Sequence, residues 1–261
     1  MEKGELLPDH LLGRTPMDIA SFWDGEADHY VSGPGSLSEV DKAILTLLAQ
    51  NGDLKEEDLV LDIGCGPGQY SNFFAGLVRG VVALDISSKM IGHAMDLCRK
   101  NGRNNVEFMN MPWEDFSSER SFDLVFASFC PAICNLDALI KMESLSRRSC
   151  CIVTRGGPCH VDEHLQALGL LLGMRFSDEA YMAPLIIEAL EGLGRRPRLH
   201  HFKIDRPKAI DRKLSMSIQR FIAAYSRGIG EGDKELFHRI LSSIKCPQSI
   251  VMTVIIWSPR L

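Results

Sequence analysis

The chain has 261 residues, of which 45% are hydrophobic and 24% are charged, so it can bury a full core within one elaborated domain. A formal net charge of -5 provides no general basic field for phosphates, which argues against a large nucleic-acid partner. The start of the chain has no secretion-type apolar run, and the most apolar stretch, residues 249–258, is too short to span a bilayer. We therefore expect a soluble, cytoplasmic protein whose eight cysteines are reduced thiols.

Short apolar runs alternate along the chain with segments of helical spacing, a pattern typical of alternating strands and helices. The expected fold class is α/β, with a doubly wound, mostly parallel seven-stranded sheet. A helix is predicted to start at a capping box of Ser36 and Glu39 and to end at Asn51-Gly52. Further helices are predicted over 70–77, 88–100, 136–146, 161–173 and 177–193, and strands over 59–63, 81–86, 106–111, 122–128, 150–155, 198–205 and 251–258.

The segment LDIGCGPGQ lies between a buried strand and a helix, the context in which a glycine loop is informative. Glycines allow a ligand to lie against the backbone, and the helix that follows presents free N–H groups to an anion. Asp62 precedes the first glycine, where it can meet an ammonium group that a dinucleotide lacks. Asp85 ends the next strand about twenty residues on, where a carboxylate can accept hydrogen bonds from both hydroxyls of a ribose. The two acids together imply an adenosine moiety joined to a cationic group.

Residues 20–157 resemble the class I, Rossmann-like methyltransferases that use S-adenosylmethionine (SAM), especially the small-molecule "type 11" branch with the ubiquinone and menaquinone methyltransferases. The resemblance rests on LDIGCGPGQ, LDIS, NVEFMNMPWEDF and SFDLVFAS, which in the family surround methionine, ribose, adenine and the transferred methyl group. It implies an enzyme that transfers methyl from SAM to a small-molecule acceptor, with S-adenosylhomocysteine (SAH) as product. Positioning supplies much of the catalysis, because the sulfonium is already activated.

The resemblance also assigns residues to the cofactor. They are Asp62, Gly64, Cys65, Gly66, Gly68, Tyr70, Asp85, Ile86, Met90, Pro112, Trp113, Glu114 and Ser128. One of them departs from the family's pattern, in which an acid often precedes the residue that touches adenine, whereas here Pro112 precedes Trp113. Because proline cannot bind the adenine amino group, we expect the backbone N–H of Trp113 and the carboxylate of Glu114 or Asp115 to replace that acid.

Ligands of such sheets bind at the carboxyl ends of the strands, so the segments after the fourth and fifth strands should border the acceptor. There His160 is a candidate general base for an acceptor hydroxyl or amine, and the alternative is a surface-loop residue. Tyr30 is the second catalytic candidate. The expected substrate-binding residues are Trp23, Cys130, Tyr181 and Phe221.

The segment FWDGEADHY, residues 22–30, resembles the stretch that covers the cofactor in many of these methyltransferases. Such a cover excludes water from the sulfonium. In a second interpretation, Trp23 and Tyr30 only seat an N-terminal helix on the sheet. Both roles can hold at once.

The cysteines near the expected acceptor site give no metal signature. Cys130, Cys134, Cys159 and His160 do not have the spacing of a compact zinc site, and we expect no metal. Cys130-Pro131 reverses the Pro-Cys dipeptide of cytosine methyltransferases that use a nucleophilic cysteine, which argues against that chemistry.

The chain is predicted to be one methyltransferase domain, 1–261, in three parts: cap helices over 1–52, a SAM-binding core over 58–157, and an acceptor-side half over 158–261 with a helical insert at about 206–245. We expect neither a nucleic-acid nor a membrane partner, and a homodimer is left open. Two other functions stay open, a SAM-binding sensor or scaffold without turnover and a protein or RNA methyltransferase. An oxidoreductase is disfavoured because the chain has no Tyr-x-x-x-Lys pair.

Overall fold

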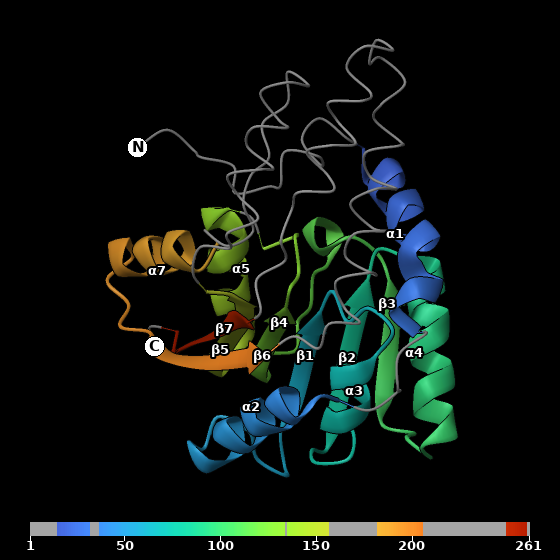
Figure 1. Cartoon of the computed structure of the whole chain (residues 1–261), viewed down its shortest axis with the longest axis horizontal. Coiled ribbons are helices and arrows are strands. Elements are labelled where there is room, and N and C mark those ends of the chain that lie inside the picture. The colour runs from blue at the N-terminus through green and yellow to red at the C-terminus, as the bar shows by residue number, and fades with distance from the viewer. Residues whose placement is uncertain (1–14, 32–36, 134, 157–181, 206–248, 260–261) are drawn as a thin grey trace.

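The computed structural model describes residues 15–31, 37–133, 135–156, 182–205 and 249–259, which form one sheet with helices on both faces (Figure 1). The strands are β1 (Leu59–Ile63), β2 (Gly80–Asp85), β3 (Val106–Asn110), β4 (Phe122–Ser128), β5 (Ser146–Arg155), β6 (Arg198–Asp205) and β7 (Ser249–Trp257). The helices are α1 (Pro16–Val31), α2 (Glu39–Gln50), α3 (Gln69–Phe74), α4 (Ser88–Lys100), α5 (Leu136–Leu145) and α7 (Met182–Gly192).

The seven strands follow the order β3-β2-β1-β4-β5-β7-β6. Strands β1 to β5 pair in parallel, whereas β7 runs antiparallel to both β5 and β6. The order reverses direction at β1, as it does in doubly wound folds. The expected α/β, mostly parallel seven-stranded sheet is therefore confirmed, with the antiparallel pairing confined to the β7 end.

Both faces of the sheet are buried, which explains why its central strands read as continuous apolar runs. Successive residues of β1 point to opposite faces: Val60 joins the core under α2 and α3, and Leu61 joins the core under α5 and α7. On the first face Ile44 and Leu48 of α2 are fully buried, and on the second face Leu139 of α5 is fully buried.

The register of the central strands brings three sequence segments to one edge of the sheet. Ile63 at the end of β1 pairs with Leu84 of β2 on one side and with Ala127 of β4 on the other. The next residues of β2 and β4 are Asp85 and Ser128, so the loop after β1 emerges between them. Residues far apart in the chain thus meet where a ligand of such a fold binds.

Helix α2 starts two residues later than the sequence predicts. Its N-cap is Ser38, whose side chain accepts a hydrogen bond from the backbone N–H of Asp41, while Asp41 accepts one from the backbone N–H of Ser38. The capping box therefore consists of Ser38 and Asp41, and the prediction that Glu39 closes a box was wrong. Leu37 is buried in the core just before the cap, which fixes where the chain turns into the helix.

Helix α3 is shorter than the sequence predicts, since it ends at Phe74. The expected apolar stripe continued to Leu77, but that residue lies in the following turn and is 45% exposed. Helix α4 spans Ser88–Lys100, as expected. Its N-cap is Ser87, whose side chain accepts a hydrogen bond from the backbone N–H of Met90.

One buried carboxylate fastens the layer of α5 and α7 to the sheet. Glu143 of α5 accepts two hydrogen bonds from the guanidinium of Arg195, at 2.7 and 2.6 Å, and one from the indole N–H of Trp257 at 2.8 Å. Arg195 follows α7, and Trp257 ends β7. A single side chain therefore joins three elements that are more than fifty residues apart in sequence.

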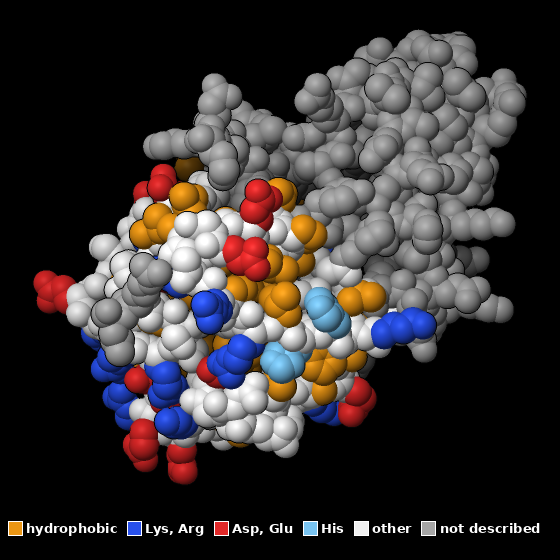
Figure 2. Space-filling model, turned by 90° about the vertical axis from the view of Figure 1, so that its left-hand side faces the viewer, with side chains coloured by type: hydrophobic (Ala, Val, Ile, Leu, Met, Phe, Trp, Pro, Cys, Tyr) orange, Lys and Arg blue, Asp and Glu red, His pale blue; other side chains and the backbone are white. Residues whose placement is uncertain are grey.

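The predicted helix over 161–173, the start of the one over 177–193 and the insert at about 206–245 lie outside the described residues. None of the helices that the structure describes combines the length and the apolar character needed to cross a membrane. Basic, acidic and hydrophobic side chains are interspersed on the described part of the face seen in Figure 2. That face gives no sign of a broad basic surface.

Candidate functional site

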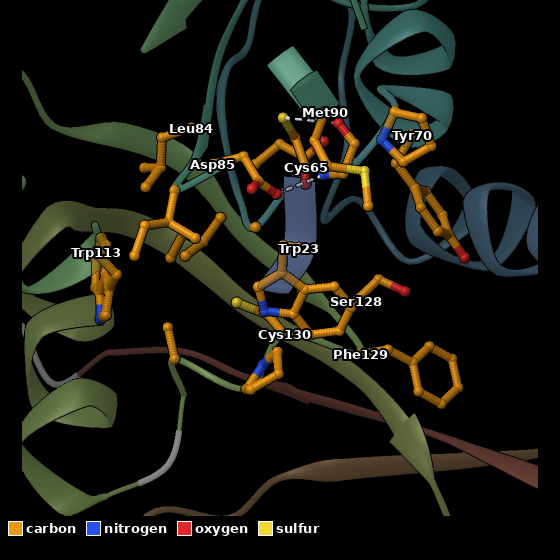
Figure 3. A pocket seen from close by; sticks show the side chains of 18 of the residues that line it. Trp23, Cys65, Tyr70, Leu84, Asp85, Met90, Trp113, Ser128, Phe129 and Cys130 are labelled. Carbon is orange, nitrogen blue, oxygen red and sulfur yellow. Dashed lines mark hydrogen bonds between the residues drawn. The ribbon is translucent and has the colours of Figure 1, made fainter. Parts of the chain in front are cut away.

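A cavity of about 440 Å³ opens at the carboxyl ends of β1, β2 and β4 (Figure 3). Trp113 stands at one end of it and Tyr70 and Phe129 at the other, with Asp85 and Cys65 between them. Helix α1 contributes Trp23, and the antiparallel strand β7 contributes Met252. The cavity is therefore built from both halves of the chain.

Three glycines shape the loop after β1, and each has a positive φ: +64° at Gly64, +53° at Gly66 and +83° at Gly68. A Cβ at Gly64 would lie 2.5 Å from the Sγ of Cys130, and one at Gly68 would lie 2.6 Å from the Cβ of Ala94. Gly64 and Gly68 therefore allow close packing. A Cβ at Gly66 would meet no atom within 4 Å, so this glycine keeps open a space beside the cavity.

Asp85 is held in place by the backbone of two loops. Its Oδ2 accepts a hydrogen bond from the backbone N–H of Gly66 at 2.9 Å, and its Oδ1 accepts one from the backbone N–H of Ser87 at 2.8 Å. Burial raises the pKa of Asp85, and these two hydrogen bonds oppose the shift. The carboxylate is thus fixed at the cavity wall with lone pairs left for further donors.

Asp62 lies deeper, at 2% exposure, where its carboxyl accepts a hydrogen bond from the hydroxyl of Ser71. Burial raises the pKa of Asp62 to about 7, the hydrogen bond from Ser71 lowers it, and the charge of Asp85 raises it further. A buried carboxyl of this kind gains most from a cation placed beside it. Of the side chains that the structure describes around the cavity, the charged ones are Asp41, Asp62, Asp85 and Glu114, and none is Lys, Arg or His.

The Trp113 end of the cavity is a single 3₁₀ turn, Trp113–Asp115, that follows Pro112. Lys141 holds this turn by donating to the carbonyl of Trp113 at 2.6 Å and to that of Glu114 at 3.0 Å, with its Nζ 4.5 Å from the centre of the indole ring. Glu114 lines the cavity, whereas Asp115 is not among its lining residues. Of the two acids expected to replace the missing one, Glu114 is therefore the better placed.

Helix α1 is fastened over the start of α4. Asp24 accepts hydrogen bonds from the hydroxyl of Ser87 at 2.5 Å and from the backbone N–H of Lys89 at 3.0 Å. The hydrogen bond from Ser87 is the main reason that the pKa of Asp24 is lowered. Trp23 and Tyr30, whose rings are 6.1 Å apart, line the cavity. This segment thus both packs on α4 and covers part of the cavity.

A second polar group lies at the Tyr70 end. The hydroxyl of Tyr70 donates to Oδ1 of Asp41 at 2.6 Å, while Oδ2 of Asp41 accepts from the hydroxyl of Ser38 at 2.7 Å. All three residues line the cavity. Ser38 and Asp41 were not predicted as site residues, although a Ser-x-x-Asp pattern at these positions marks a helix start.

The thiols of the site are poor nucleophiles. Burial raises the pKa of Cys130 to about 12 and raises that of Cys65 well above its ordinary value. Cys65, Cys98, Cys130, Cys150 and Cys151 are free thiols, as expected. Within the described ranges no three His, Cys, Asp or Glu side chains are grouped so as to hold a metal ion.

The structure brings most of the predicted site residues together. Every residue assigned to the cofactor lines the cavity except Gly68, which packs on α4, and Trp23, Tyr30 and Cys130 line it too. His160, Tyr181 and Phe221 lie outside the described residues, as do Cys134 and Cys159. Several lining residues were not predicted from the sequence, among them Ile19, Ser38, Asp41, Gln69, Phe129 and Met252.

Comparison with known proteins agrees with this geometry. Residues 60–148 match the sequence profile of a family described as "Methyltransferase domain". The chain is 37% identical over 78 residues to a tRNA/tmRNA (uracil-C(5))-methyltransferase of Campylobacter curvus, covering 28% of this chain and 21% of that protein. It is 29% identical over 94 residues to pavine N-methyltransferase of Thalictrum flavum, covering 35% of this chain and 26% of that protein. The chain spans about half or less of the length of the curated relatives it matches.

A solved structure extends the likeness to most of the chain. The fold is similar to that of magnesium protoporphyrin IX methyltransferase from Synechocystis PCC 6803 with bound SAH. The TM-score is 0.59 at 16% identity, and the alignment covers 92% of this chain and 98% of the other. At this identity the likeness concerns the fold.

Proposed function

Residues 60–148 form a methyltransferase domain of the class I, Rossmann-like kind, and on this premise we propose that the chain transfers the methyl group of SAM to a small-molecule acceptor. The observation that carries the proposal is the placement of Asp62 and Asp85 on either side of the glycine loop, in a cavity whose described walls hold no cationic side chain. SAM is itself a cation, with a sulfonium and an ammonium group.

The residues of the cavity fit SAM group by group. Asp85 offers lone pairs to the two ribose hydroxyls, and Asp62 would gain an ammonium partner for its buried carboxyl. The open space at Gly66 admits a ligand against the backbone, and the turn with Trp113 and Glu114 offers a place for adenine. When bound, SAM supplies an activated methyl group, and the chain's residues would orient the two reactants and exclude water.

Several features support a small acceptor. The cavity, at about 440 Å³, is within the size range of small-molecule sites, and Trp23 of α1 is one of its walls. Pavine N-methyltransferase and magnesium protoporphyrin IX methyltransferase, both similar to this chain, are named for small-molecule substrates. The free thiols and the net charge of -5 are in keeping with a cytoplasmic enzyme that does not bind nucleic acid.

An RNA acceptor has weaker support. The match to the uracil-C(5)-methyltransferase covers only 21% of that protein. A carbon-directed reaction through a cysteine would need a thiolate, and burial raises the pKa of Cys130 to about 12.

The test is to incubate the protein with methyl-labelled SAM and an extract of the producing cells, divided into metabolite, RNA and protein fractions. Label should pass to the metabolite fraction with stoichiometric SAH, and an Asp85→Ala variant should form neither. Label in RNA or protein would contradict the small-molecule acceptor. SAM binding without transfer to any fraction would instead indicate a sensor or scaffold.

A further inference from the structure

The hydroxyl of Tyr70 directs its proton toward Asp41 and not into the cavity. That proton is donated to Oδ1 of Asp41 at 2.6 Å, while Oδ2 of Asp41 accepts a hydrogen bond from the hydroxyl of Ser38 at 2.7 Å. Burial, and next to it the charge of Asp41, raise the pKa of Tyr70 well above its ordinary value, so the phenol keeps its proton. Asp41 therefore fixes the direction of the Tyr70 hydroxyl.

Because its proton is engaged by Asp41, the phenol oxygen of Tyr70 offers acceptor lone pairs, and no donor, to a molecule in the cavity. Figure 3 shows the hydroxyls of Tyr70 and Ser128 on the same side of the cavity, beside Phe129. A bound molecule that carries an N–H or O–H group could therefore donate to this end. A carboxylate could not, because it has no proton to donate and would face the charge of Asp41.

The backbone next to Ser128 also indicates a built site. Phe129 has a φ of +48°, the one positive φ among the described residues other than glycine. Its backbone N–H is fixed on the carbonyl of Val153 at 2.9 Å, and its ring remains 43% exposed at the cavity. Strained backbone of this kind persists where the surrounding structure holds it and is found most often at functional sites. Phe129 adds an apolar side chain beside the hydroxyls of Tyr70 and Ser128, and Trp23 and Met252 also line the cavity.

We propose that the methyl acceptor is an amine with an apolar body, held through its N–H groups by Tyr70 and Ser128, with Asp41 as the group that takes up its proton. The inference rests on the proposed methyltransferase function and names the acceptor class of the same site, and it places Tyr70 and Ser128 on the acceptor, whereas the resemblance assigns them to the cofactor. Asp41 has two roles in this proposal. It orients the hydroxyl of Tyr70 through their hydrogen bond, and it is the final acceptor of the proton.

The reaction balances with the groups named. The ammonium form of the acceptor passes one proton through the hydroxyl of Tyr70 to Asp41, which leaves a neutral amine with a free electron pair. That pair forms the new N–CH₃ bond while the C–S bond breaks and its electrons return to sulfur. The products are SAH and a methylated ammonium ion, and Asp41 releases its proton to solvent.

Binding to the SAH complex tests this without knowledge of the natural acceptor. Phenethylamine and phenylacetate are of similar size and opposite charge, and their affinities for the protein saturated with SAH can be measured by calorimetry. We expect the wild type to prefer phenethylamine by at least about tenfold, as one opposite-charge contact in a partly buried site can supply. Equal affinity for the two probes, a preference for phenylacetate, or binding of neither would overturn the inference.

Variants then assign the preference to its residues. Asp41→Asn should abolish most of the preference, and Tyr70→Phe should reduce it. Glu39→Gln is the matched control, because it removes a carboxylate from the same helical turn at a side chain that is 88% exposed and outside the cavity, and it should retain the preference. Retention of the full preference in Asp41→Asn would overturn the assignment.

SAH binding itself separates this inference from the proposed function. Asp41→Asn should bind SAH within about threefold of the wild type, because in the proposed arrangement Asp41 does not touch the cofactor. A large loss of SAH affinity would place Asp41 on the cofactor's ammonium group and overturn the acceptor assignment. Failure of the wild type to bind SAH would instead overturn the proposed function.

Discussion

The carboxylate of Asp85 accepts a hydrogen bond from the backbone N–H of Gly66 over 2.9 Å, so the end of β2 holds the tip of the loop after β1. The same carboxylate accepts a hydrogen bond from the backbone N–H of Ser87, the N-cap of α4. Asp85 thereby sets the relative position of a loop, a strand and a helix that all border the cavity. Its proposed role in ligand binding and its role in shaping the loop are therefore coupled through one side chain.

Replacement of Asp85 should remove cofactor binding while the fold survives. Two charge-assisted hydrogen bonds to a ribose contribute enough that Asp85→Ala should weaken SAH binding by at least about 100-fold. Asp85→Asn keeps one carbonyl oxygen and should lie between this variant and the wild type. Calorimetric titration with SAH measures both, and circular dichroism confirms folding. Wild-type affinity in Asp85→Ala would show that the ribose lies elsewhere.

Alanine substitutions at two glycines of the loop should have different effects, one mainly on stability and the other mainly on SAH binding. Alanine at Gly68 combines a φ of +83° with a contact of 2.7 Å to the Cα of Ala94, so Gly68→Ala should lower the free energy of unfolding by about 2 kcal/mol or more. Gly66→Ala meets no neighbour within 4 Å and should cost only about 1 kcal/mol of strain.

The added methyl group of Gly66→Ala occupies the space proposed for the ligand, so this variant should lose most of its SAH affinity. Thermal unfolding and SAH titration of the two variants provide the comparison. If Gly66→Ala binds SAH normally, the ligand does not approach the backbone at this point.

The raised pKa of Asp62 predicts two opposite pH dependences. Because the folded, ligand-free protein holds this proton up to a pKa of about 7, against 3.8 for the ordinary carboxyl, stability should fall as pH rises from about 4 to about 7. Binding of a cationic ammonium requires the ionised form, so SAH affinity should rise over pH 6 to 8, by at most about tenfold per pH unit.

Asp62→Asn should remove both dependences, and calorimetry in buffers of different ionisation enthalpy should show proton release on SAH binding at pH 6 for the wild type. An SAH affinity that is independent of pH in the wild type would contradict the pairing of Asp62 with the ligand's ammonium group.

The hydrogen bonds that Glu143 accepts from Arg195 and Trp257 should contribute strongly to the stability of the fold. Glu143→Ala leaves the part-buried guanidinium of Arg195 and the buried indole N–H of Trp257 without their partner, and the free energy of unfolding should fall by about 3–5 kcal/mol. Trp257→Phe removes one hydrogen bond to a charged group and should cost about 1.5–3 kcal/mol.

Chemical denaturation of the two single variants and the double variant gives their coupling. An additive double variant would show that the two contacts stabilise the fold independently. SAH affinity, measured where all variants are folded, should stay near the wild-type value because none of these residues lines the cavity.

The parts of the site predictable from sequence are those encoded within one short segment. The glycine loop with Asp62, and Asp85 at the end of the next strand, are fixed by the spacing of a strand, a turn and a helix, so their meeting follows from the βαβ geometry. The same holds for the N-cap of α4 at Ser87, where a hydroxyl precedes a helical pattern.

Other parts depend on contacts between distant segments. Two overlapping patterns, Ser36 with Glu39 and Ser38 with Asp41, both suit a helix start, and the burial of Leu37 accompanies the second. Met252 reaches the cavity only because β7 pairs with β5 across about a hundred intervening residues. The hydrogen bond from Tyr70 to Asp41 likewise joins two helices whose relative placement no local pattern specifies.

The most direct test of the account is a calorimetric titration of the purified wild-type chain with SAH, and in parallel with a nicotinamide dinucleotide. We expect one SAH molecule to bind per chain, and we expect this binding to be lost in Asp85→Ala. The dinucleotide should not displace bound SAH. Binding of the dinucleotide in preference to SAH, or no binding of SAH at all, would contradict the assignment of this cavity to SAM.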